Sequence, residues 1–88
     1  MSPIEWWKEN PDAELPLYQL RRHVGLTRAR MWRWWNRGLV HPQDRGLPPT
    51  EQRRIRLETF ITANGRATTW NKYLAFMRAR DVRTYAQQ

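Results

Sequence analysis

Arginine and tryptophan crowd into residues 28–37, which read RARMWRWWNR. From Arg21 to Arg37 the chain holds six arginines and no carboxylate. A guanidinium group is planar and permanently charged, and it donates paired hydrogen bonds to phosphate oxygens or to a guanine edge. The chemistry that this spacing offers is therefore the binding of a polyanion, and not the transfer of a proton or a chemical group.

No set of residues in the sequence is typical of a catalytic or metal site. His23 and His41 stand apart, cysteine is absent, and there is no glycine-rich phosphate loop. Catalysis needs a convergent acid, base or nucleophile, and thiolate metal sites need cysteine. We therefore expect a protein that is not an enzyme and that carries no metal and no cofactor.

The charge of the whole chain favours a polyanionic partner. The net charge is +8, and fourteen of the sixteen cations are arginine. Residues 1–14 hold four acidic groups against Lys8, a net −3, while the rest carries 15 basic and four acidic groups, a net +11. A basic body with an acidic end indicates binding to a nucleic acid.

No apolar run reaches the roughly 20 residues that span a bilayer, and no secretory signal is visible, so we expect a cytoplasmic protein, in bacterial cytoplasm or nucleoid.

Two short helices around a glycine turn are predicted to position these arginines. Apolar residues at helical spacing place the first helix at residues 17–24. Gly25-Leu26 provides the turn, Thr27 can cap a second helix, and Gly38 ends that helix after Arg37. Two helices joined by a tight glycine turn are typical of a helix-turn-helix, whose second helix can enter the major groove of DNA.

A helical projection sorts the second helix into an apolar inner side and a basic outer side. At about 100° per residue, the inner side holds Thr27, Met31, Trp34 and Trp35, and the outer side holds Ala29, Arg33 and Asn36. The two edges hold Arg30 with Arg37 and Arg28 with Trp32. Arg33 is therefore expected near the middle of the outer side.

The length of 88 residues allows one domain, and the predicted fold class is mainly α. We expect an acidic N-terminal helix and linker at 1–15, the helix-turn-helix at 17–38, an irregular or hairpin segment at 39–49, two further helices within 50–80, and a tail at 81–88. Of the two further helices, Thr50 starts one that Asn64-Gly65 ends, and Thr68 or Thr69 starts the other. We expect the core to take up the stripe of Trp70, Tyr73, Leu74 and Met77, and to be covered by Trp6 and Trp7.

From residue 17 to about residue 77 the chain resembles the winged helix-turn-helix DNA-binding domains of the MerR type, and the phage excisionases and AlpA-like regulators related to them. The resemblance rests on Gly25-Leu26-Thr27, Met31, Arg33-Trp34-Trp35, Arg37-Gly38-Leu39-Val40, Pro42 and Pro49-Thr50-Glu51. It implies a small winged helix-turn-helix in which 39–49 form a short or degenerate wing. The long dimerisation helix of full MerR regulators is missing, so we expect no small-molecule effector.

The resemblance implies sequence-specific binding to double-stranded DNA, as an excisionase-type architectural factor or a transcription regulator of a phage or mobile element. The base contacts that it implies are Arg28, Arg30 and Arg33, because arginine reads guanine with two hydrogen bonds. The DNA backbone contacts that it implies are Thr27, Arg21, Arg22, Arg37, Arg45, Arg53 and Arg54. The further partners that the resemblance implies are a second copy of the protein on DNA, an integrase or RNA polymerase. We expect no association with a membrane.

The same residues leave an alternative open, a small phage-type protein that binds a host protein or RNA through its tryptophan and arginine surface. Exposure separates the two hypotheses. Tryptophans open to solvent beside the acidic residues 5–14 would favour a protein partner. A continuous stripe of arginines across the second helix and the wing would favour DNA.

Overall fold

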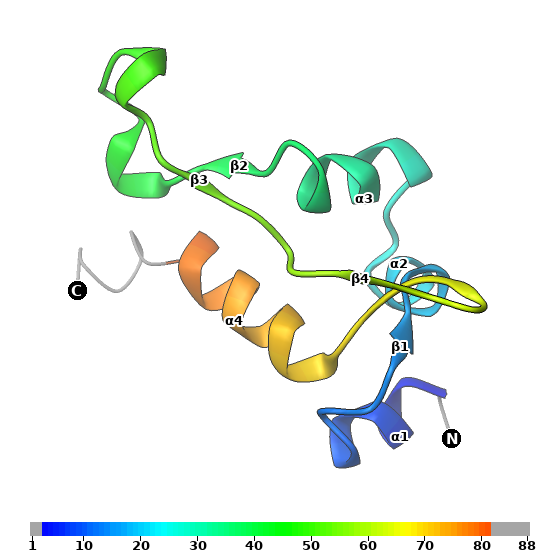
Figure 1. The fold of residues 1–88 in the computed structure, drawn as a ribbon. Coiled ribbons are helices and arrows are strands. Elements are labelled where there is room, and N and C mark those ends of the chain that lie inside the picture. Colours follow the sequence, from blue (N-terminus) through cyan, green and yellow to red (C-terminus); the bar gives the residue numbers. More distant parts are fainter. Residues whose placement is uncertain (1–2, 82–88) are drawn as a thin grey trace.

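The computed structural model describes residues 3–81 (Figure 1). Its α-helices are α1 (Pro3–Glu9), α2 (Leu17–Val24), α3 (Arg28–Trp35) and α4 (Trp70–Arg80). Its strands are β1 (Leu15–Pro16), β2 (Leu39–Val40), β3 (Arg54–Ile55), β4 (Phe60–Thr62) and β5 (Gly65–Thr68). The described part is therefore mixed α and β, and the prediction of a mainly α domain is wrong. Of the predicted tail, residues 82–88 lie outside the described residues.

The helices that have local start and stop signals agree with the prediction. Gly25 ends α2 at φ 80°, a left-handed conformation that glycine adopts readily. Thr27 caps α3, because its Oγ1 accepts a hydrogen bond from the Arg30 N–H at 3.2 Å. Thr69 caps α4 in the same way, with the Lys72 N–H at 3.1 Å.

The predicted helix from Thr50 to residue 63 is wrong. Thr50 lies in a 3-10 turn at Pro49–Glu51, and the chain beyond it runs extended through β3 and β4. Burial alternates there: Leu57 is buried between the exposed Arg56 and Glu58. This period of two is the strand pattern. The Asn64-Gly65 pair, interpreted as a helix stop, instead closes the β4–β5 hairpin, with Gly65 at φ 112°.

The β4–β5 hairpin joins the helix-turn-helix through strand pairing. The sheet order is β1-β5-β4, all antiparallel, and Leu15 of β1 pairs with Thr68 of β5. β1 runs directly into α2, so the hairpin is attached at the start of the two-helix unit. The segment 39–49 forms no hairpin of its own, because its strand β2 pairs with β3 from outside the segment. The tight hairpin of this fold thus lies at 60–68 and not at the predicted wing.

A small core ties these elements together. Its buried residues come from α1, β1, α2, α3, the segment after β3, and α4: Ile4, Leu15, Leu20, Met31, Trp34, Leu57 and Phe76. In Figure 1 the chain from β3 to β4 passes between α3 and α4, and the Leu57 N–H donates to the Trp34 carbonyl at 2.9 Å. Phe76 is the buried residue of α4, while three residues of the predicted stripe pack at the core edge: Trp70, Tyr73 and Met77.

Candidate nucleic-acid interface

Helix α3 presents a basic surface to solvent and an apolar side to the core. Met31 and Trp34 are buried, as the helical projection predicts. The exposed residues of the helix and its C-terminal end are Arg28, Ala29, Arg30, Trp32, Arg33, Asn36 and Arg37. The three predicted base-contacting arginines therefore share the solvent side of one helix.

Within the described residues, these arginines have no acidic side chain as an ion-pair partner. Within residues 3–81, the ion pairs join Lys8 to Glu5, Arg53 to Asp44, Lys72 to Glu58 and Arg80 to Asp81. Among those residues, no arginine of α2 or α3 has a carboxylate within salt-bridge distance. A helix face with several cations and no anion creates a positive potential that attracts phosphates.

The two arginines of α2 differ in what they can contact. Arg22 is exposed, as a phosphate contact requires. Arg21 is only partly exposed, and its Nη1 donates to the carbonyl of Leu26 at 3.3 Å. That bond spans the turn between α2 and α3, so Arg21 helps to hold the two helices together. The sequence could not show this, because the bond depends on the path of the turn.

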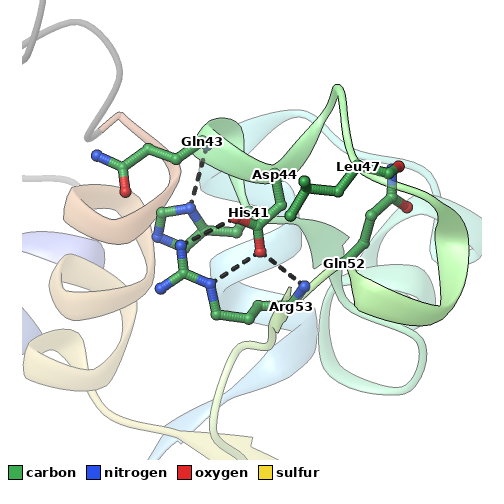
Figure 2. Close-up of polar contacts among 6 residues, drawn as sticks. All are labelled: His41, Gln43, Asp44, Leu47, Gln52 and Arg53. Carbon is green, nitrogen blue, oxygen red and sulfur yellow. Dashed lines mark hydrogen bonds and ion pairs between the residues drawn. The ribbon is translucent and has the colours of Figure 1, made fainter.

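Residues 41–53, which we call the 41–53 loop, project beyond the β2–β3 strand pair and contain two of the predicted backbone contacts, Arg45 and Arg53 (Figures 1 and 2). The Arg53 guanidinium donates two hydrogen bonds to Asp44, from Nε to Oδ2 at 2.8 Å and from Nη2 to Oδ1 at 2.9 Å. The Arg53 backbone N–H also donates to Oδ2 at 2.8 Å. The guanidinium of Arg53 is thus occupied within the loop, whereas Arg45 is exposed beside it.

The hydrogen bonds from Arg53 change the pKa of Asp44. Hydrogen bonds from the Arg53 side chain, and then from its backbone N–H, lower the pKa of Asp44 from 3.8 to about 2. The same contact raises the pKa of Arg53 above its ordinary value. Figure 2 shows two smaller contacts that support the loop, from the Gln43 N–H to His41 Nδ1 and from Gln52 to the Leu47 carbonyl. Arg54, in β3, donates to the carbonyl of Gly38 at 3.4 Å, so it lies beside the short segment that joins α3 to β2.

Aromatic rings and arginines form a continuous surface along one edge of α3. Trp32 is 43 % exposed, and its ring contacts Trp35 edge to face, with centroids 6.3 Å apart. The Arg37 guanidinium lies 5.9 Å from the Trp32 ring centre, and the Arg66 guanidinium lies 3.9 Å from the Trp35 ring centre. Arg66 belongs to β5, so sequence analysis missed it. The only available signal was its position after the Asn64-Gly65 turn.

The acidic end of the chain carries a second exposed tryptophan. Trp7 packs against the core and donates its Nε1–H to the carbonyl of Glu14 at 2.7 Å. Trp6 is 53 % exposed, and in the sequence it lies between the acidic residues Glu5 and Glu9. The expectation that both rings cover the core therefore holds for Trp7 and is wrong for Trp6.

The described part of the chain shows neither a metal-binding cluster nor a membrane-spanning helix. Across residues 3–81, His, Asp and Glu side chains form no group of three that could hold a metal ion. Over the same span, every helix is too short or too polar to cross a bilayer.

Comparisons with known protein families, curated proteins and solved structures found no match for this chain.

Proposed function

We propose that this protein binds double-stranded DNA sequence-specifically, with the exposed side of α3 in the major groove. The observation that carries the proposal is the exposure of Arg28, Arg30 and Arg33 on a capped helix, without carboxylate partners in the described residues. A helix with its side chains is roughly 10–12 Å wide and matches a major groove of about 12 Å. Arginine at the base edges can discriminate guanine from other bases.

The roles within this interface follow from how free each side chain is. Arg33 and its exposed neighbours Arg28 and Arg30 contact base edges. The backbone contacts come from Thr27, Arg22, Arg37, Arg45 and Arg54, whose side chains are all exposed. Arg53 and Arg21 serve first to hold the 41–53 loop and the helix turn: Arg53 is exposed but makes two side-chain bonds to Asp44, and Arg21 donates to the Leu26 carbonyl. Arg54 makes a single 3.4 Å bond to the Gly38 carbonyl, and we assign its remaining N–H groups to a phosphate. The β4–β5 hairpin, whose Arg66 contacts α3, takes the place of the wing in this proposal.

The biological role that we propose is an excisionase-type architectural factor or a transcription regulator of a phage or mobile element. It is supported by the resemblance of residue 17 to about residue 77 to such proteins and by the two-helix geometry around Gly25. In either role the protein binds DNA through the basic side of α3. Its partners on DNA are a second copy of the protein, an integrase or RNA polymerase.

The test is selection of binding sites from a random duplex library, followed by affinity measurements on the selected and a scrambled duplex. Arg33→Ala should lower affinity for the selected site by about 5- to 150-fold and change affinity for the scrambled duplex much less. Arg78→Ala, an exposed arginine on α4, is the charge-matched control and should affect both duplexes alike. If no sequence is enriched and no duplex binds even in low salt, the proposal is wrong.

A second candidate function is the binding of a host protein through α1. The observation that favours it is the exposed ring of Trp6 beside Glu5 and Glu9, a surface that DNA would repel. Aromatic side chains exposed in this way often anchor protein interfaces. If Trp6→Ala abolishes the biological effect while duplex affinity is unchanged, this second function is supported.

A further inference from the structure

An open groove of about 440 Å³ lies between α2 and α3, at the edge of the basic surface. Its apolar floor includes Leu17 and Met31, and its sides carry the rings of Tyr18 and Trp32, which are 55 % and 43 % exposed. Large aromatic rings are normally covered in a domain this small, because their burial supplies much of the stability. These two rings are instead open on either side of one depression.

Two cations are among the residues that line this groove. Arg21 and Arg28 line it together with the rings, and no Asp or Glu is among the lining residues. Outside the groove, Arg37 lies against Trp32 and Arg66 against Trp35. A ligand that fits must therefore be flat and unsaturated in its middle and negatively charged on its flanks.

A nucleotide strand has this distribution of chemistry. Bases stack on aromatic side chains whatever their identity, and arginines alongside hold the phosphates. Arg28 and Trp32 flank the exposed side of α3. A base that leaves the helix stack, next to a major groove occupied by α3, would therefore lie close to the groove between α2 and α3.

We propose that the groove between α2 and α3 binds one unpaired base of DNA, held by the Tyr18 and Trp32 rings, with Arg37, which lies against Trp32, at a flanking phosphate. This proposal rests on the proposed function, because α3 brings the strand to the groove. It adds a preference for duplexes that are kinked or opened at one base, as enzymes and architectural proteins meet them during DNA rearrangement.

The experiment compares a fully paired duplex that carries the selected site with the same duplex containing one unpaired base at successive positions. Affinities are measured by fluorescence anisotropy in one buffer. The wild-type protein should bind one of the unpaired-base duplexes about 5- to 150-fold more tightly than the paired duplex, since stacking adds to the existing contacts. Trp32→Ala should remove this preference, so that the variant binds the paired and the unpaired-base duplexes with equal affinity.

The matched control is Trp6→Ala, which deletes an exposed tryptophan outside the groove. It should keep the preference in full. Tyr18→Ala should reduce the preference as Trp32→Ala does, and Trp32→Phe should restore part of it, because a smaller ring still stacks. Circular dichroism of each variant verifies that the helices are intact.

The outcomes separate this proposal from the proposed function. Equal affinity for paired and unpaired-base duplexes overturns the groove as a base site and leaves duplex binding standing. Loss of the preference in Trp6→Ala as well would assign the effect to contact between two copies, with α1 in the groove, and would also overturn it. A stronger preference for the same bulge in RNA would overturn the assignment to DNA. Failure to bind either DNA refutes the proposed function itself.

Discussion

The Arg66 guanidinium covers the ring of Trp35, with its central carbon 3.9 Å from the ring centre. Its Nη1 also donates to Thr59 Oγ1 at 2.8 Å. The first contact joins strand β5 to the last turn of α3, and the second crosses to the segment before β4. This one side chain therefore sets the hairpin beside the helix that carries the candidate interface.

Replacing Arg66 should loosen the hairpin. A cation over an indole ring contributes about 0.5–1 kcal/mol at exposed sites and about 2 kcal/mol when desolvated. Arg66→Ala should lower the free energy of unfolding by roughly 1–2 kcal/mol, measured by urea denaturation. Arg66→Lys keeps the charge but loses the planar fork, and it should recover only part of that loss. An unchanged midpoint for Arg66→Ala would show that the contact adds no stability.

Gly38 should be the most sensitive glycine of the interface. It has φ 76°, and a Cβ there would lie 2.6 Å from the Ile55 carbonyl oxygen. Gly25 is the matched control, since it has φ 80° but nothing within 4 Å of an added Cβ. Gly25→Ala should cost about 1–2 kcal/mol for the left-handed backbone alone, and Gly38→Ala should cost more. Thermal unfolding of the two variants tests this order, and equal costs would contradict the close approach of β3 to α3.

The contact of Asp44 with Arg53 should make the 41–53 loop acid-sensitive. Folding lowers the pKa of Asp44 from 3.8 to about 2, so its stabilising contribution is complete above the unfolded value and is lost as the pH falls toward the folded one. Amide resonances of the loop should therefore shift between about pH 4 and pH 2, measured by NMR titration. In Arg53→Ala the Asp44 transition should move to higher pH, and an unmoved transition would rule out the Arg53 side chain as the cause of the low pKa, because the backbone N–H donor remains in this variant.

Arg45 should contribute to DNA affinity without contributing to sequence preference. It is exposed at the 41–53 loop, whereas the neighbouring Arg53 is bound to Asp44. Arg45→Ala should weaken binding to all duplexes alike and reduce the slope of log affinity against log salt by about one unit. A slope identical to that of the wild type would exclude the loop from the DNA interface.

The sequence by itself determined the helical part of the candidate interface. Gly25, the Thr27 cap and the Thr69 cap act through bonds within a few residues, so local chemistry was enough to place α2, α3 and the start of α4. The inward direction of Met31 and Trp34 was equally readable, because it follows from helical geometry alone.

Only the tertiary structure decided that residues 50–68 form strands and not a helix, and which contacts each arginine makes. Ile55, Leu57, Phe60 and Ile61 satisfy a helical pattern as well as a strand pattern, and the choice depends on which strands pair: β3 pairs with the distant β2 at Leu39, and β4 pairs with the next strand, β5, at Ala67. Arginines are alike in sequence, yet Arg53 is bound to Asp44, Arg66 covers Trp35, and Arg33 is open to solvent. Non-local contacts create these differences, because a hydrogen bond or ring contact exists only where the folded chain brings both partners together.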